Sequence, residues 1–128
     1  MMDSDEVLAA HRAHFDATMG EVPESLEQLA AEAPAYFHGY AMAREWLLRP
    51  DEDAALPLRY RHLLCSILDC ANGNLGGALN HGRAAARNGL TADEYRDAAV
   101  VLIITRGTPA WGAYGRKVLA MLREEEAH

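Results

Sequence analysis

The sequence predicts an all-α fold, a bundle of six or seven helices in one domain that spans residues 1–128. Three observations predict this fold class. Proline and glycine divide the chain into helix-sized pieces, no piece alternates like a strand, and most pieces repeat apolar residues every three or four positions. With 128 residues, 50% of them hydrophobic, the chain has the size and composition of a single globular domain. A chain of this length buries roughly two-thirds of its unfolded surface without disulfide or metal support.

Three helices are expected in the first part of the chain, over about residues 4–18, 23–33 and 34–49. Asp3 or Ser4 is expected to cap the first of them. Each helix has an apolar face at helical spacing. These faces are Val7, His11, Phe15 and Thr18; Leu26, Leu29, Ala30 and Ala33; and Phe37, Tyr40, Ala41 and Leu48. An acidic linker over residues 51–55 follows.

Two further helices are expected on either side of a break at residues 71–74. The fourth helix starts near Pro57, and its core side is expected to consist of Leu64, Ile67 and Leu68. The fifth helix covers about residues 75–88, and Gly89 ends it.

The last two helices have the clearest signals. Thr91 and Glu94 form a capping box, which starts the sixth helix at once. Its amphipathic stripe is the best in the chain, with Tyr95, Ala98, Ala99, Leu102 and Ile103. After a turn at residues 107–109, the seventh helix has an apolar face made of Trp111, Tyr114, Val118, Leu119 and Leu122.

Charge and composition exclude several classes of partner. The net charge of −7 and the pI of about 5.3 disfavour binding to nucleic acid or to an anionic membrane. No apolar run approaches the ~20 residues that a spanning helix needs, and the acidic N-terminus does not resemble a secretory signal. Cys65 and Cys70 are five positions apart on one expected helix and point to different sides, so we expect thiols in a reducing bacterial cytoplasm.

Most familiar catalytic signatures are absent from the sequence. It has no phosphate-binding glycine loop, no Cys-x-x-Cys and no paired-cysteine zinc pattern, so neither a cofactor nor a metal is expected. The histidines are the remaining candidates. His11 and His14 are interpreted as an amphipathic edge, His38 as a packed side chain, and His128 as solvent-exposed.

His81 and His62 have more informative surroundings. Small residues flank His81 on its helix face and leave space for a neighbouring helix or for a ligand: Gly77, Ala78, Ala84 and Ala85. His62, Cys65 and Asp69 form a polar strip on the fourth helix, and such a strip is either exposed or lines a cavity. Two histidines and a carboxylate are also acceptable metal ligands, although no metal site is predicted.

The segments LRYRHLL (58–64) and NHGRAAARNGLTADEY (80–95) resemble the carboxymuconolactone decarboxylase and alkyl hydroperoxidase D-like family. Val22-Pro23, the expected sixth helix and the turn at residues 107–110 are also similar to that family, so the resemblance covers about residues 23–122. It implies an all-helical fold that assembles as a trimer or hexamer. It also implies a pocket near the family histidine, which His81 matches.

The resemblance favours the decarboxylase-like branch. In the peroxidase branch, the second cysteine of a Cys-x-x-Cys stands four residues before the histidine, and Asn74 and Gly77 occupy the two cysteine positions here. A thiol-dependent hydroperoxidase would have to use Cys65 instead. The family glutamate nineteen positions before the histidine is His62, so an imidazole replaces the carboxylate of the family's proton relay.

These features together predict a cofactor-independent acid–base enzyme that acts on a small oxygenated metabolite, as a decarboxylase, lactone isomerase or cyclase. His81 is the expected acid or base and His62 its partner. Further candidates for substrate binding are two arginines that suit a carboxylate and three aromatic residues that suit a pocket wall: Arg83, Arg106, Tyr60, Trp111 and Tyr114. The alternative is a non-catalytic ligand-binding or assembly module on the same fold.

Overall fold

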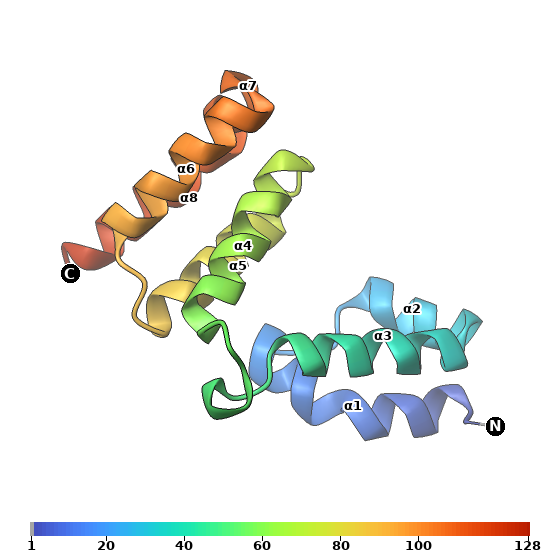
Figure 1. The fold of residues 1–128 in the computed structure, drawn as a ribbon. Helices are drawn as coiled ribbons and strands as arrows, with labels where there is room; N and C mark the ends of the chain where they lie inside the picture. The colour runs from blue at the N-terminus through green and yellow to red at the C-terminus, as the bar shows by residue number, and fades with distance from the viewer. Residues whose placement is uncertain (1) are drawn as a thin grey trace. The chain divides into compact units, whose positions relative to one another are not determined.

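The computed structural model describes residues 2–128, and this part of the chain is helical without strands, as predicted (Figure 1). It divides into two compact units, one up to Arg49 and one from Pro50 to His128. The expectation of a single domain remains a prediction. Within residues 2–128, no helix combines the length and the apolar character that crossing a membrane requires.

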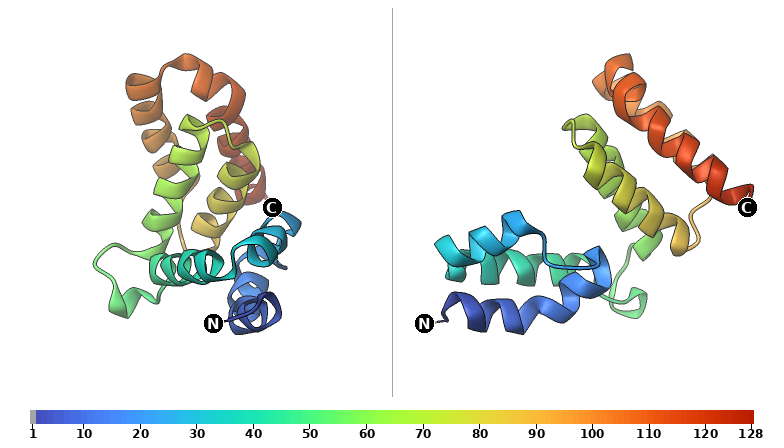
Figure 2. Two further views of the ribbon diagram at one scale, coloured as in Figure 1. Left: turned by 90° about the vertical axis from the view of Figure 1, so that its right-hand side faces the viewer. Right: turned by 180° about the vertical axis from the view of Figure 1, so that it is seen from behind.

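The first unit contains three helices, α1 (Ser4–Met19), α2 (Glu24–Glu32) and α3 (Pro34–Leu47), which lie side by side (Figures 1 and 2). The Asp3 carboxylate caps α1 by accepting a hydrogen bond from the amide of Glu6 at 2.9 Å. The core consists of fully or almost fully buried apolar residues from all three helices and the turn before α2: Val7, Phe15, Val22, Ala30, Phe37 and Ala41. Tyr40, expected on the apolar face of α3, is 37% exposed, so that expectation is wrong.

The second unit begins with a short helical turn, η1 (Asp51–Asp53), followed by α4 (Leu58–Ala71) and α5 (Leu75–Arg87), which pack against each other along most of their length. The capping box of Thr91 and Glu94 starts α6 (Ala92–Arg106), as predicted.

The expected seventh helix is interrupted. It consists of α7 (Thr108–Ala110), a π-helical turn η2 (Trp111–Gly115) and α8 (Arg116–Glu126). Gly115 faces the core within this turn, where a Cβ would lie 3.3 Å from a methyl group of Leu102.

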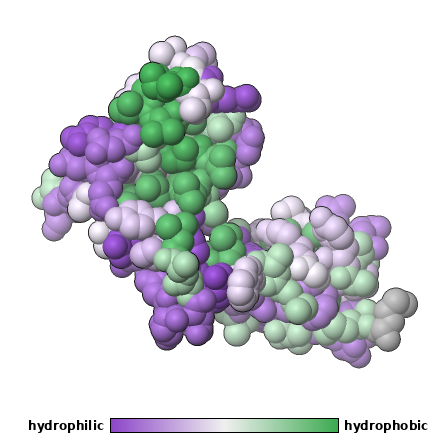
Figure 3. Space-filling view, viewed as in Figure 1, coloured by the Kyte–Doolittle hydropathy of each residue, from purple (hydrophilic) through white to green (hydrophobic). Residues whose placement is uncertain are grey.

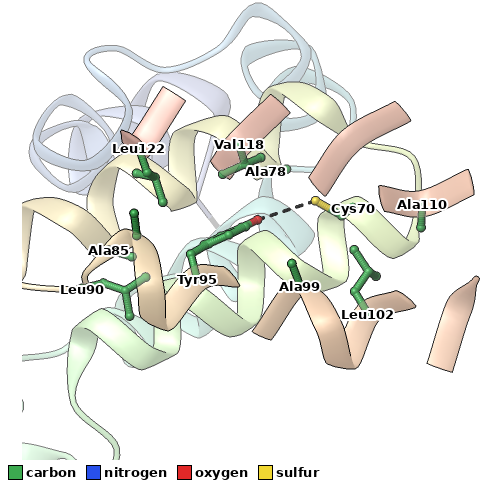
Figure 4. Packing of buried hydrophobic residues seen from close by; sticks show 11 residues of the cluster. Cys70, Ala78, Ala85, Leu90, Tyr95, Ala99, Leu102, Ala110, Val118 and Leu122 are labelled. Carbon is green, nitrogen blue, oxygen red and sulfur yellow. Dashed lines mark hydrogen bonds between the residues drawn. The ribbon is translucent and has the colours of Figure 1, made fainter. Parts of the chain in front are cut away.

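Tyr95 of α6 is the largest fully buried side chain of the second unit. Figure 4 shows its hydroxyl directed toward Cys70 of α4, 3.7 Å away, among side chains from α5 and α8. The same hydroxyl lies 2.7 Å from the hydroxyl of Ser66 on α4. A polar contact therefore joins α4 and α6 inside the core.

The expected core side of α4 is wrong in two of its three residues. Leu64 and Leu68 are 51% and 59% exposed, and the buried face consists instead of Arg61, His62, Ser66 and Cys70. Small Ser66 and Cys70 are needed where the bulky ring of Tyr95 approaches α4, so the leucines turn outward. Figure 3 shows a hydrophobic area on the surface of the second unit.

Candidate functional site

The candidate site centres on His62 and His81, which α4 and α5 place opposite each other. The two Nδ1 atoms are 2.9 Å apart, and the ring centroids are separated by 5.2 Å with an interplanar angle of 37°. His62 is 7% exposed, whereas His81 is partly exposed. The structure thus brings together the two residues that the sequence predicts as acid–base partners.

A hydrogen bond between α4 and α5 fixes the level at which the two histidines meet. Ser66, one turn after His62, donates from its hydroxyl to the carbonyl of Ala78, one turn before His81, at 2.7 Å. Both groups are buried, so the loss of this bond would leave an unsatisfied polar group. Because Ser66 also contacts Tyr95, the bond connects the histidine pair with the core of the unit.

The small residues around His81 serve helix packing. Ala78, Ala84 and Ala85 are buried, and Gly82 permits the close approach of α8. A Cβ on Gly82 would lie only 2.7 Å from Cγ1 of Val118. Of the two alternatives that the sequence left open, a neighbouring helix therefore explains this face of α5.

Asp69 extends the site toward the N-terminus of α5. Burial raises the pKa of its carboxyl above the usual value, while the nearby His81 and a hydrogen bond with Asn74 oppose this rise. The carboxylate occupies the space beside Gly77, where a Cβ would lie 2.5 Å from Oδ2. The polar strip of α4 is therefore turned at least partly toward α5 and is not a fully exposed edge.

The site lies in the part of the chain that relates it to known proteins. Residues 31–120 match the model of the Carboxymuconolactone decarboxylase family, and this stretch makes up more than half of the sequence. The chain belongs to the carboxymuconolactone decarboxylase family. This confirms the predicted resemblance and fold class.

A solved structure agrees with this assignment. The crystal structure of a putative carboxymuconolactone decarboxylase from Burkholderia xenovorans LB400 is 41% identical in sequence. The match has a TM-score of 0.86 and covers 97% of this chain and 94% of that one. Comparison with curated proteins gives no match.

In this member of the carboxymuconolactone decarboxylase family, structural roles are filled by the residues at the two positions where the peroxidase branch has cysteines, Asn74 and Gly77. Asn74 caps α5 by accepting a hydrogen bond from the amide of Gly77 at 3.0 Å. Gly77 in turn leaves space for Asp69. The sequence places Asn74 in the break between two helices and Gly77 beside His81, but the cap was not predicted, although an asparagine just before a helix is a recognisable capping signal.

Cys65 and Cys70 are both thiols, as expected. Cys70 is buried, and burial raises the pKa of its thiol, which disfavours a thiolate. Cys65 lies partly buried on α4. Within residues 2–128, no group of three histidine, cysteine or carboxylate side chains is arranged to hold a metal ion.

Three of the five residues predicted for substrate binding have contacts outside the histidine pair. The hydroxyl of Tyr60 donates to Glu94 at the start of α6, 2.8 Å away. Arg83 forms an ion pair with Glu125, with 3.4 Å between the nearest atoms and both side chains nearly half exposed. Trp111 packs against the core of the second unit. Their role in substrate binding remains a prediction.

The other two, Arg106 and Tyr114, line a common cavity of about 550 Å³ at the C-terminal ends of α4 and α6. The remaining lining residues are Cys70, Ala71, Asn72, Gly73, Pro109, Ala110 and Ala113. The guanidinium of Arg106 donates through Nε to the carbonyl of Ala71 at 3.2 Å. Arg106 is the only charged residue in the lining, which does not include His62 or His81.

Proposed function

We propose that this member of the family is a cofactor-independent acid–base enzyme acting on a small oxygenated metabolite, with His81 and His62 as its reacting pair. The single observation that carries the proposal is the distance of 2.9 Å between the two Nδ1 atoms. At this distance the two imidazoles share one hydrogen, with one ring donating and the other accepting. If both Nδ1 atoms carried a hydrogen, two donors would face each other. Protonation of one ring therefore opposes protonation of the other, and the pair takes up its protons in separate steps.

The different burial of the two rings supports different roles for them in this proposal. His62 is buried and therefore acts as the positioning residue, whereas the partly exposed His81 reaches the substrate. Because Nδ1 of His81 faces His62, Nε2 is the atom that exchanges a proton with the substrate. In this arrangement the acid–base group His81 is oriented by a second group behind it, as a catalytic base commonly is.

These two groups suit reactions that pass through an enolate. When a β-keto acid or a related lactone acid loses carbon dioxide, the electron pair of the broken carbon–carbon bond remains as an enolate. Protonated His81 would donate its proton to the enolate carbon, and the pair would recover that proton from water. Isomerisation of a lactone would use the same proton transfers without the loss of carbon dioxide.

Turnover of small lactones and keto acids by the wild type, His81→Gln and His62→Gln tests this proposal. Removal of a general acid or base costs about 10²–10⁴-fold in rate. We expect a loss of this size for His81→Gln and a smaller loss for His62→Gln. His128→Gln, at the exposed C-terminus, is the matched control and should retain full activity. Unchanged turnover in His81→Gln, with the fold intact, would refute the proposal.

A specific observation favours a second candidate, a ligand-binding module. The cavity next to Arg106 falls within the range of about 300–1,000 Å³ that is typical of small-molecule sites, and its only charge is positive. A small carboxylate is the matching ligand, because a guanidinium binds carboxylates through paired hydrogen bonds. If carboxylates stabilise the wild type and His81→Gln equally but not Arg106→Gln, the binding module is favoured over the enzyme.

We also propose that the protein is a homo-oligomer, a trimer or hexamer as the family resemblance implies. Large apolar side chains of the second unit are more than half exposed and support this proposal: Leu64, Leu68, Val100, Val101 and Ile104. Ile104, at 80%, is the most exposed of them. Light scattering of the wild type and Ile104→Glu tests the proposal, and a monomeric wild type would refute it.

A further inference from the structure

The first unit contains a second histidine pair, which the acid–base proposal for His62 and His81 does not use. His11 of α1 lies between two residues of α3, His38 and Glu45. Its Nδ1 is 2.6 Å from Oε1 of Glu45, and its Nε2 is 2.7 Å from Nδ1 of His38. His38 and Glu45 are seven positions apart, two helical turns on one face of α3, so the ring of His11 bridges them.

Glu45, His11 and His38 form a hydrogen-bonded chain of side chains, and hydrogen-bonding rules determine which nitrogen carries each proton in it. An ionised Glu45 only accepts, so Nδ1 of His11 donates to it. A neutral His11 then has an acceptor at Nε2, which requires Nδ1 of His38 to donate. His38 is thereby held in the tautomer with a lone pair at Nε2.

The middle of the hydrogen-bonded chain, His11, and its outer end, His38, have different surroundings. His11 is 5% exposed and packs edge-on against Phe37, which fixes its orientation. His38 is partly exposed, and its Nε2 has no hydrogen-bond partner among residues 2–128. One turn further along α3, Met42 is 53% exposed and offers an apolar contact. The chain therefore ends in an accessible proton acceptor beside an apolar side chain.

The neighbouring charges leave Glu45 available to this chain. Burial lowers the pKa of His14, and the guanidinium of Arg44 lowers it further, against the opposing effect of Glu45. His14 is therefore predominantly neutral near pH 7 and does not compete with His11 as a cation beside Glu45. A positive charge on His11 faces the Glu45 carboxylate at 2.6 Å, and His38 is connected to that carboxylate only through His11.

We propose that Glu45, His11 and His38 form a second proton-transfer site, at which Nε2 of His38 accepts the proton of a bound weak organic acid such as a phenol or an enol. The acid's O–H bond breaks, its electron pair stays on the oxygen, and the proton forms an N–H bond at His38. The resulting oxyanion pairs with the protonated histidine, and Glu45 balances the positive charge through His11. His38 touches the ligand, whereas His11 and Glu45 are positioning residues.

The probe for this site is 4-nitrophenol, whose phenolate is distinguished from the phenol by its visible absorbance. At a pH where the unbound phenol is mostly protonated, addition of the wild-type protein should increase the fraction of phenolate until the increase saturates with protein concentration. His38→Gln should abolish this signal. Glu45→Gln keeps an acceptor for His11 but removes the charge, and should lower the apparent affinity for phenolate on the order of tenfold. Glu32→Gln, an exposed carboxylate of the same unit, is the matched control and should behave as wild type.

His81→Gln distinguishes this site from the proposed active site, because it should retain the phenolate signal even where turnover is lost. Nitrogen NMR of the imidazoles adds a measurement without ligand, in which His38 should carry its hydrogen on Nδ1. Three results would each overturn the proposal: no phenolate signal in the wild type, a signal unchanged in His38→Gln, or a hydrogen on Nε2 of neutral His38. If Glu45→Gln lowers the melting temperature but not the phenolate signal, the chain is a structural clamp and the proposal fails.

Discussion

Two neighbouring glycines in the first turn of α5 differ sharply in their surroundings. A Cβ on Gly77 would lie 2.5 Å from Oδ2 of Asp69 and 2.6 Å from Nδ2 of Asn74. A Cβ on Gly76 would meet only Oδ1 of Asn74, at 3.9 Å. Alanine at these two positions therefore changes the helix equally in composition but very differently in contacts.

The expected free energies follow from these distances. Replacing a helical glycine with alanine stabilises by about 0.5–1 kcal/mol, and Gly76→Ala should show this gain. Gly77→Ala gains the same amount but displaces Asn74, whose loss as a helix cap costs about 1 kcal/mol. It also pushes the carboxylate of Asp69 away from its place near His81. Gly77→Ala should therefore be about 1 kcal/mol less stable than Gly76→Ala, a difference of about 4 °C in melting temperature.

Thermal and urea unfolding of the two variants, measured alongside turnover, check this prediction. Gly76→Ala should melt above the wild type with unchanged activity, whereas Gly77→Ala should melt near or below the wild type with reduced activity. Equal melting temperatures for the two variants would show that Asn74 and Asp69 yield without cost. Gly77 would then not be required for the position of Asp69.

Three further predictions concern the polar and packed groups around the site. Burial raises the pKa of the Asp69 carboxyl, so its charged form destabilises the fold at pH values above its ordinary pKa of 3.8. Asp69→Asn should therefore raise the melting temperature at pH 7, by an amount that shrinks as the pH falls toward 3.8. Tyr95→Phe should cost about 1 kcal/mol in urea unfolding at pH 7. Burial raises the pKa of the Tyr95 hydroxyl above its ordinary value of 10.0, so the fold loses stability above pH 10, where this tyrosine ionises in the unfolded chain. Tyr95→Phe should also remove that part of the loss. Gly82→Ala should cost about 1–3 kcal/mol, and Val118→Ala in the same chain should recover part of that cost if their contact is the cause.

The helices could be predicted from the sequence because local chemistry determines where they begin and end. Asp3 and the capping box of Thr91 and Glu94 start α1 and α6 at the predicted residues, since these side chains satisfy backbone amides within their own turn. The buried face of α4 was a different problem. Its leucines form a regular apolar stripe, but the ring of Tyr95, 29 residues from Ser66 along the chain, requires small side chains on the other face.

The candidate site could be predicted only as far as residue types allow. Their sequence surroundings and the family resemblance both pointed to His81 and His62, but no local pattern gives the distance between two side chains that are 19 residues apart. The chain through His11 was missed entirely, because its hydrogen bonds span 27 and 34 residues. Only the spacing of His38 and Glu45, two turns apart on one helix, could have pointed to it. That spacing is informative once a third side chain is known to lie between them.

By the family resemblance His62 takes the place of a glutamate, which changes what the partner of His81 could do in the proposed mechanism. A carboxylate beside a histidine only accepts a hydrogen bond, so it orients the ring and favours its charged form. An imidazole at 2.9 Å either donates or accepts, so in the proposed mechanism the pair of His62 and His81 would pass a proton between its rings. The chain of the first unit combines both devices, because Glu45 supplies the fixed charge and His11 transmits it to His38. The two pairs therefore suit different tasks. As proposed, the pair of His62 and His81 would release a proton to a carbanion, whereas the hydrogen-bonded chain with Glu45 would retain a proton beside an oxyanion.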